Sequence, residues 1–393
     1  MDKIHSLNIN HLSKEMKLII ALLKETDKEL ISQSEKLTEG IDWNHFLDLS
    51  FHHRVFPIMK TKLKFVDTGA NVPSFVLDVL DKEHKKNTFQ MLFLTSEMEK
   101  ISKVFTANHL RLLFLKGPVV AQALYGNVSL RTSHDIDLLV DIHDYSRAKD
   151  QMIQMGFAEK DYIKSVLNDW KWRHHHSVFH HQKSGIKVEI HWRLHPGPGS
   201  EPDFNELWNR RSQSTLTKQP IYLLGNEDLF YFLTAHGARH GWSRLRWLYD
   251  IHQLTKQEVN WSKTRTLLKK YHSAQIGGQA LVLSKVIFGS NITAHEQRKL
   301  MNNRSMKLAR HAIYYLENMI NLHDETLPQD VAKYHKRHLF SLMSLHQKTL
   351  FTLSFLYPYP EDAELLPLPK QLHLLYFPFR PFLWAWRKTR ALP

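Results

Sequence analysis

The stretch Leu115-Lys116-Gly117-Pro118, followed later by Asp135-Ile136-Asp137-Leu138-Leu139-Val140, decides the fold that this sequence predicts. Arg111–Leu115 has the pattern of a short buried strand, Gly117 opens a turn, and Pro118 suits the first position of a helix. Such a strand, glycine turn and helix start present backbone N–H groups and a positive helix end to an anion. Lys116 and Gly117 are therefore candidates for holding a phosphate.

The alternation of side chains along strands predicts an acidic face. Successive side chains point to opposite faces, so Asp135 and Asp137 share a face while their apolar neighbours enter the core. Along the strand predicted within residues 186–194, the polar face carries Lys187, Glu189, His191 and Arg193. Crowded carboxylates are costly unless a cation neutralises them, and Mg²⁺ binds a few carboxylates together with water and phosphate oxygens. We expect Asp135, Asp137 and Glu189 to bind Mg²⁺ or Mn²⁺ and to support phosphoryl or nucleotidyl transfer.

The run LKGPVVAQALYGNVSLRTSHDIDLLV at residues 115–140 resembles the nucleotidyltransferase superfamily. The signature of that superfamily is a glycine turn after the first strand, an Asp-x-Asp on the second and a third acid on a later strand. More narrowly, the chain resembles the uncharacterised bacterial nucleotidyltransferases often called family 5. The likeness extends to EIHWRL at residues 189–194 and to HGARHGWSRLRWLYDI at residues 236–251, and it covers about residue 40 to about residue 385.

The resemblance implies an enzyme that binds a nucleoside triphosphate, with ATP expected, and transfers a nucleoside monophosphate to a hydroxyl-type acceptor on a small molecule or peptide. Asp135 and Asp137 would hold the metals, and Glu189 would complete the second metal site and act as a base. Lys116, the Gly117 backbone and Arg131 would hold the departing pyrophosphate. The remaining candidates for contact with nucleotide or acceptor are His191, Arg193 and His240.

The turn departs from the superfamily at one position. A Gly-Ser pair is usual there, with the serine touching a phosphate, whereas this chain has Gly117-Pro118. Phosphate contact must then come from elsewhere. The alternative prediction is a catalytically inactive nucleotidyltransferase-fold module that binds an anionic partner, since a fold does not by itself imply a reaction.

Composition limits the classes of protein that fit. The 393 residues carry a net charge of +14 and no cysteine, which excludes disulfides and thiolate metal sites. The positive charge favours anionic partners. Nucleic acid is not expected among them, because no recognition motif accompanies the charge. Neither a secretory signal nor an apolar stretch long enough for a membrane helix is recognisable, so a cytoplasmic location is expected.

Two groups of histidines are candidates for binding a metal or a substrate. Zinc binding by His174–His176 and His180-His181 is disfavoured, because adjacent side chains on a strand point apart. A polar strand near the active site is expected instead, and contact of one of these histidines with substrate or phosphate is preferred to zinc binding. His236 and His240 lie four apart on a predicted helix and share one face. No glutamate stands between them as a zinc peptidase requires, so that chemistry is not expected. The helix either sends His240 or an arginine toward the nucleotide across a cleft, or belongs to an interdomain network of hydrogen bonds and ion pairs.

The order of elements predicts an α+β fold, with a mixed nucleotidyltransferase-type sheet flanked by helical regions. We expect an N-terminal helical subdomain (1–108), a catalytic core (109–198) and a C-terminal helical domain (199–393). Predicted helices include 13–34, 43–53, 74–108, 144–155, 226–255, 262–273, 275–288, 294–322 and 330–356. The aromatic and basic run Leu374–Arg387 favours a tail clamped onto the domain by its aromatics, with weak contact to a membrane surface as the alternative.

Overall fold

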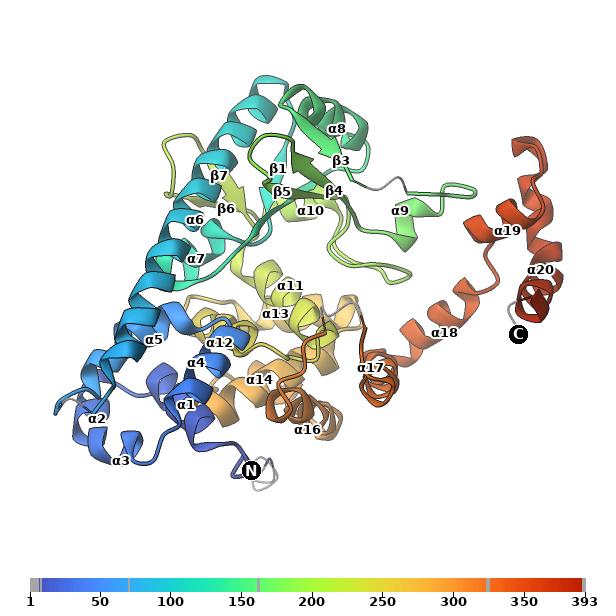
Figure 1. Ribbon diagram of the computed structural model, residues 1–393. Helices are drawn as coiled ribbons and strands as arrows, with labels where there is room; N and C mark the ends of the chain where they lie inside the picture. Colours follow the sequence, from blue (N-terminus) through green and yellow to red (C-terminus); the bar gives the residue numbers. More distant parts are fainter. Residues whose placement is uncertain (1–6, 8, 70, 161–162, 323–325, 391–393) are drawn as a thin grey trace.

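A computed structural model describes residue 7 and residues 9–69, 71–160, 163–322 and 326–390 (Figure 1). Helices precede and follow a single mixed sheet, which confirms the expected α+β class. The first helices are α1 (Lys14–Lys24), α2 (Asp27–Ser32), α3 (Ser34–Thr38), α4 (Trp43–His52), α5 (Phe56–Lys62) and α6 (Ser74–Ala107). Within and around the sheet lie α7 (Pro118–Tyr125), α8 (Tyr145–Gln154), α9 (Trp170–Arg173) and α10 (Phe204–Asn209). The later helices are α11 (Asn226–Arg239), α12 (Leu245–Leu254), α13 (Trp261–Lys270), α14 (Ala274–Phe288), α15 (His295–Leu300), α16 (Asn303–Glu317), α17 (Gln329–Leu342), α18 (Leu345–Ser354), α19 (Pro360–Leu365) and α20 (Tyr376–Arg390).

The sheet has seven strands in the order β3-β4-β5-β2-β1-β7-β6. The strands are β1 (Leu112–Phe114), β2 (Asp135–Val140), β3 (Phe157–Glu159), β4 (His176–His181), β5 (Lys187–His191), β6 (Ser212–Ser214) and β7 (Ile221–Leu223). Strand β2 pairs antiparallel with β1 and parallel with β5. The register of the parallel pair sets Asp137 directly opposite Glu189. The two predicted acidic strands are therefore neighbours at the centre of the sheet.

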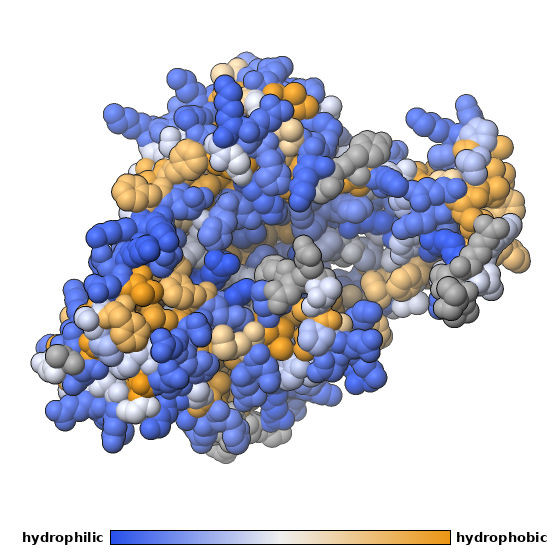
Figure 2. All heavy atoms as spheres, viewed as in Figure 1, coloured by the Kyte–Doolittle hydropathy of each residue, from blue (hydrophilic) through white to orange (hydrophobic). Residues whose placement is uncertain are grey.

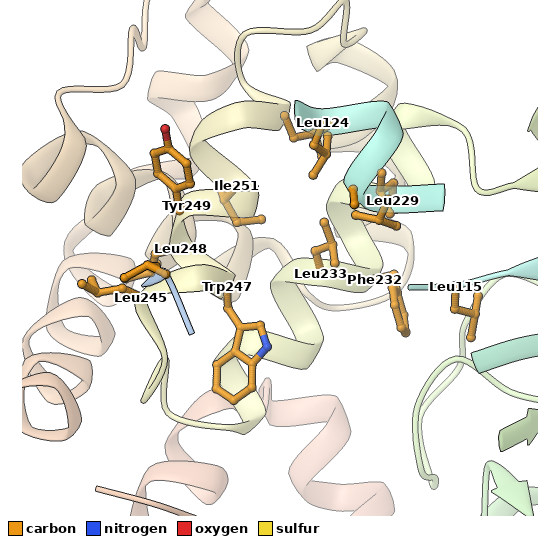
Figure 3. Close-up of a cluster of buried hydrophobic side chains, with 14 of the residues drawn as sticks. Leu115, Leu124, Leu229, Phe232, Leu233, Leu245, Trp247, Leu248, Tyr249 and Ile251 are labelled. Atoms are coloured by element: carbon orange, nitrogen blue, oxygen red, sulfur yellow. The ribbon is translucent and has the colours of Figure 1, made fainter. Parts of the chain in front are cut away.

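Helices from the parts of the chain before and after the strands pack around the sheet. In Figure 1 the long helix α6 runs from the N-terminal helices along the sheet, while α11 to α16 lie below it. Figure 3 shows how α11 packs near the turn region: Leu229, Phe232 and Leu233 lie toward Leu115 and Leu124. Helix α12 contacts α7. One contiguous set of buried apolar side chains runs from α1 through the sheet to α16. This packing fixes α11 and α12 against the face on which the strands present their acids.

Local sequence signals explain where several helices break. The single helix predicted over 13–34 ends at Lys24, because Thr26 and Glu29 form a capping box that starts α2. The helix predicted over 226–255 is divided into α11 and α12. Trp242 lies in the turn between the two helices and has a left-handed backbone conformation (φ 57°). Its side chain is fully buried against Gly237. A Cβ at residue 237 would lie 2.2 Å from the Trp242 ring, so only glycine permits this turn.

The sheet does not end with the predicted core at residue 198, since β6 and β7 add to its edge beside β1. Strand β7 pairs parallel with β1, which gives it a place in the sheet that the sequence pattern did not predict. Parallel partners can be far apart in sequence, so a local pattern does not reveal them. The division into three domains stays a prediction.

The chain ends in a segment that we call the C-terminal arm, residues 345–390, which comprises α18, α19, a short 3₁₀ helix (Lys370–Leu375) and α20. In Figure 1 the arm projects away from the helices below the sheet. Helix α20 continues through Pro378 and Pro381. Pro378 lies in the first turn, where the N–H groups have no helical partner and a proline is tolerated, whereas Pro381 lies inside the helix. Among the described residues, every helix is too short or too polar to span a bilayer.

Candidate nucleotide and metal site

The acids of β2 and β5 meet below a cavity at the centre of the sheet. One ligand atom from each of Asp137, Glu189 and His191 lies within 4.8 Å of the others. Asp137 is fully buried, and its Oδ2 has no hydrogen-bond partner among the described residues. A buried carboxylate oxygen without a partner is costly, and a divalent cation would satisfy it. The donor set of two carboxylates and one imidazole fits such a cation.

Cations of the protein surround the same group. Lys116 Nζ lies 2.8 Å from Asp137 Oδ1, and His191 Nε2 lies 3.2 Å from that oxygen. Lys187 Nζ lies 2.5 Å from Glu189 Oε1. Each carboxylate of the group therefore has a positive partner, which makes the charge cluster stable before any ligand binds.

These contacts shift the pKa values of the group in opposite directions. Burial raises the pKa of Asp137 and of Glu189, but the charges of Lys116 and His191 and the hydrogen bond from His191 outweigh it, so both pKa values are lowered. Burial likewise lowers the pKa of His191, but its hydrogen bonds to the two acids raise the pKa above its ordinary value. The acids are ionised at neutral pH and His191 tends to keep its proton, which a metal ion would displace.

Asp135 occupies a different environment from the other two predicted ligands. Its side chain lines the cavity, Lys187 Nζ lies 3.6 Å from Oδ2, and Ser133 Oγ lies 3.4 Å from Oδ1. Burial and the neighbouring Asp137 raise the pKa of Asp135. Of the predicted trio, Asp135 and Glu189 line the cavity, whereas Asp137 is buried beside it. The residue that joins Asp137 and Glu189 within ligand distance is His191. The alternation along the strand placed His191 on the same face as Glu189, and contact with nucleotide or acceptor was predicted for it.

The cavity above these acids has a volume of about 420 Å³ and an excess of cationic side chains. Arg239 and Arg246 are half-buried, and two of their buried atoms, Nη1 of Arg239 and Nε of Arg246, have no hydrogen-bond partner among the described residues. Burial lowers the pKa of Arg246 to about 9. Buried guanidinium donors without partners favour an anion. The cations that line the cavity are Arg54, Lys116, Arg131, Lys187, Arg239, Arg244 and Arg246.

The glycine turn has the expected geometry, and hydroxyl groups lie close to it. Gly117 adopts φ 75° before α7, a conformation that favours glycine. Ser133 Oγ lies 3.7 Å from where a Cβ of Gly117 would be, and both Ser133 and Thr132 line the cavity. The hydroxyl that the superfamily has after its glycine is absent at Pro118, yet hydroxyls of the segment before β2 reach the same wall. Sequence reasoning missed them, as it missed Arg54 from the N-terminal helices.

Comparison of the sequence with known families identifies the fold. Residues 39–289 match the family described as uncharacterised nucleotidyltransferase. The chain belongs to this family. The match confirms the resemblance that the glycine turn and the Asp-Ile-Asp strand predicted, and it makes a nucleotide the implied substrate class.

Similarity outside the family is weak. No curated protein is significantly similar in sequence. An antigenic nucleotidyltransferase-like protein from Paracoccidioides brasiliensis is 12% identical over 53% of this chain and 96% of its own, with a TM-score of 0.32. MenT4, a nucleotidyltransferase toxin from Mycobacterium tuberculosis H37Rv, is 12% identical over 65% of this chain and 93% of its own, with a TM-score of 0.29. At these TM-scores neither likeness adds to what the family match shows.

Two residues predicted to bind phosphate in this nucleotidyltransferase-family chain are engaged elsewhere. Arg131 borders the cavity, but its guanidinium pairs with the buried Asp250, at 3.0 Å from Nε to Oδ1 and 3.1 Å from Nη2 to Oδ2. Arg193 lies outside the cavity and binds the carbonyl oxygens of Trp172 and Gly199. Strand β5 ends at His191, so the alternation that placed Arg193 beside Glu189 does not continue that far.

The histidines fall into two groups around the cavity. His236 and His240 line it from the α11 side with ring centroids 4.6 Å apart, as their spacing predicted. On the sheet side His175 Nε2 lies 3.1 Å from His176 Nδ1, so these neighbours do not point apart as expected. Strand β4 begins only at His176, and the residue before a strand is not bound by its alternation. One nitrogen each of His175, His176 and His191 lies within 4.8 Å of the others.

A second cavity, of about 840 Å³, opens on the other side of these histidines. It lies between the β4 region and the C-terminal arm, and its lining includes Trp172, Phe351 and Tyr359. His175 and His176 line both cavities. The two spaces therefore adjoin across the histidine pair.

Proposed function

We propose that the protein binds a nucleoside triphosphate with a divalent cation and transfers the nucleoside monophosphate to a hydroxyl-type acceptor on a small molecule or peptide. The observation that carries the proposal is a cavity rich in cations, next to the group formed by Asp137, Glu189 and His191. Two of these cations, Arg239 and Arg246, each have a buried nitrogen without a hydrogen-bond partner among the described residues. Triphosphate is the ligand that matches this charge, and Mg²⁺ or Mn²⁺ matches the donor set.

Each part of the wall has a role in this proposal. Asp137, Glu189 and His191 hold the cation, which when bound neutralises phosphate charge and polarises the phosphorus–oxygen bonds. Asp135 faces the same space from the start of β2. Lys116, the Gly117 backbone, Arg239 and Arg246 hold the phosphates, and the hydroxyls of Thr132 and Ser133 supply the contact that Pro118 cannot make. Arg131 has an indirect role: its ion pair with Asp250 joins the segment before β2 to α12 and so positions that segment.

The second cavity is the proposed acceptor site. An acceptor hydroxyl there would reach the α-phosphorus past His175 and His176, forming the new oxygen–phosphorus bond as the bond to pyrophosphate breaks. The hydroxyl proton needs an acceptor. His176 is neutral at pH 7, because burial and the neighbouring His191 lower its pKa to about 4. The contact with His175 holds the His176 ring in place. We therefore assign His176 as the base that accepts the hydroxyl proton, because Glu189 would bind the cation.

The test is incubation with each labelled nucleoside triphosphate, Mg²⁺ or Mn²⁺ and fractionated cell extract, with pyrophosphate release and labelled product as readouts. Glu189→Gln keeps the shape and removes the charge, and turnover is expected to fall by about 10²-fold or more while triphosphate affinity changes modestly. The matched control is Glu159→Gln, a paired glutamate on β3 of the same sheet outside the cavity. Triphosphate binding with no turnover in any extract would favour the inactive binding module instead.

A further inference from the structure

We infer that the C-terminal arm docks on the surface of an anionic lipid bilayer. Most large side chains of α20 and the turn before it face solvent, although soluble proteins seldom expose so many together. The exposed apolar residues of this part of the arm are Leu372, Leu374, Leu375, Phe377, Phe379, Phe382, Trp384 and Trp386. Phe382 is 73% exposed and Trp386 is 52% exposed. In Figure 2 hydrophobic atoms gather on the arm, apart from the largely hydrophilic surface of the body.

Charged contacts on the inner side of α20 fix which face is outward. Arg380 Nη1 lies 2.7 Å from Asp362 Oδ1 on α19, and Arg387 Nη2 lies 3.0 Å from the same oxygen. Tyr376 and Leu383 are buried in a small cluster with Val166. These four residues of α20 have helical spacing and form one stripe. The helix therefore cannot turn its aromatic face inward without breaking a buried ion pair.

The contacts of the arm with the body combine polar groups with some of its aromatics, so the expected clamp by aromatics accounts for part of the attachment. The arm is held to the body by Arg173, whose Nη2 lies 3.2 Å from the Tyr357 carbonyl oxygen, and by a hydrogen bond from Tyr357 to the Leu167 carbonyl oxygen. Phe377 packs against the Tyr357 ring with centroids 5.2 Å apart, and Tyr376 is buried with Val166. Polar contacts and these two aromatics position the arm, whereas Phe379, Phe382, Trp384 and Trp386 are exposed.

The charge of the arm identifies the surface that it fits. From residue 366 onward the sequence contains Lys370, Arg380, Arg387, Lys388 and Arg390 and no aspartate or glutamate. The acid that serves the inner stripe, Asp362, is already neutralised by two arginines. Tryptophan and phenylalanine beside lysine and arginine, on a helix too short to span a bilayer, are typical of a segment that lies in the headgroup region of anionic lipid.

A second copy of the chain fits the arm less well than lipid. A twofold interface would bring the arm against its own copy, since such an interface uses the same patch on both subunits. Lys370 and Lys388 would then face like charges, because the acids of the arm, Glu361, Asp362 and Glu364, are already paired with Arg387, Arg380 and Lys164. Anionic headgroups supply the missing negative charge, and the acyl boundary accepts the aromatics. The inference is independent of the reaction proposed above.

The test measures partition of the full chain onto vesicles of phosphatidylcholine alone and of phosphatidylcholine mixed with phosphatidylglycerol, by co-sedimentation. Binding is expected on the mixed vesicles only, with quenching of tryptophan fluorescence by brominated lipid. The triple variant Phe382→Ser, Trp384→Ser, Trp386→Ser should bind at least about tenfold more weakly. The matched control replaces the exposed Phe75, Phe89 and Phe93 of α6 by serine and should bind as the native chain does.

A second pair of variants tests the charge without altering the aromatics. Lys370→Glu with Lys388→Glu should weaken binding by about tenfold or more, on the scale expected for reversing two cations near an anionic surface. Lys36→Glu with Lys103→Glu makes the same change of net charge elsewhere and should have little effect. Vesicle binding that is absent, or that survives both arm variants, would overturn the inference. A dimer in sedimentation that the serine variant dissociates and vesicles do not compete with would overturn it in favour of a self-interface.

Discussion

Lys116 Nζ lies 2.8 Å from Asp137 Oδ1, so a lysine from the turn after β1 neutralises the fully buried acid of β2. The lysine reaches the cavity, where it can also face a phosphate. A metal cation bound by Asp137 would take the place of Lys116 at the carboxylate, and a triphosphate bound at the turn would attract Lys116. The contact is therefore the point at which binding of the metal and binding of the nucleotide affect one another.

This relationship predicts opposite effects for Lys116→Met. Without ligand the variant should be less stable than the native chain, because it leaves Asp137 buried and unpaired. Added Mn²⁺ should raise its melting temperature more than that of the native chain, since Lys116 no longer competes for the carboxylate. Triphosphate should bind more weakly. Thermal scans with and without each ligand separate the three effects, and an equal Mn²⁺ shift in both proteins would show that Lys116 does not compete.

Arg131→Met tests whether the arginine before β2 serves structure or phosphate. Its pair with Asp250 is buried, and Tyr125 donates a hydrogen bond to the same acid at 2.7 Å. Removing one partner of a buried pair costs about 3 to 5 kcal/mol. Urea unfolding should show this loss in Arg131→Met, and the double variant with Asp250→Leu should recover much of it. If Arg131→Met keeps native stability but loses triphosphate affinity, the phosphate role predicted from the sequence is the correct one.

The sequence predicted the parts of the site that depend on local geometry. The alternation along β2 placed Asp135 and Asp137 on one face, and Gly117 and Pro118 marked the turn and the start of α7. The register of β2 with β5 could be expected from the family resemblance, and the structure confirms it by pairing Asp137 with Glu189.

The parts that the sequence could not supply depend on distant contacts. Asp250 lies far along the chain from Arg131, and no local pattern indicates that a buried acid of α12 would take that guanidinium. Arg54 enters the cavity from the N-terminal helices for the same reason. Arg193 was misplaced because the length of a strand is set by its partner: β5 pairs with β4 only as far as His191.

The buried neutral histidines predict loss of stability in mild acid. Burial, reinforced by the charges of His52 and Arg244, lowers the pKa of His53 well below its ordinary value. The folded state therefore excludes a proton that the unfolded state accepts below about pH 6.5, so stability is full above that pH and falls as the pH drops toward the folded pKa. One such group contributes a slope of about 1.4 kcal/mol per pH unit. Burial lowers the pKa of His195 and His236 in the same way.

Unfolding by urea at a series of pH values measures that slope. In His53→Asn the amide oxygen can replace Nδ1, which accepts the Leu245 N–H at 3.3 Å, and the titrating group is gone. Below pH 6.5 the slope of the free energy of unfolding against pH should decrease by up to about 1.4 kcal/mol per pH unit, which corresponds to one proton. The exposed His143→Asn serves as the control and should keep the native slope. An unchanged slope in His53→Asn would mean that His53 protonates without unfolding.

The imidazole in the ligand group predicts which metal the site prefers. Mg²⁺ favours oxygen donors, whereas Mn²⁺ and later divalent metals accept imidazole nitrogen. His191 Nε2 lies 3.2 Å from Asp137 Oδ1 and 3.4 Å from Glu189 Oε2, so a cation held by these acids also meets this nitrogen. The native chain should bind Mn²⁺ more tightly than Mg²⁺. His191→Asn should lower the Mn²⁺ affinity by about tenfold or more and change the Mg²⁺ affinity less.

Electron paramagnetic resonance of bound Mn²⁺ reads the ligand directly. A nitrogen coupling is expected in the native chain and in the control His240→Asn, which alters a histidine on the opposite wall of the cavity. The coupling should vanish in His191→Asn at Mn²⁺ concentrations that still fill the site. The hydrogen bonds that raise the pKa of His191 add a second signature, because a metal must displace its proton and Mn²⁺ affinity should then rise with pH. A Mn²⁺ spectrum that is identical in His191→Asn would assign the cation to oxygen ligands alone, and the preference for Mn²⁺ would lose its physical basis.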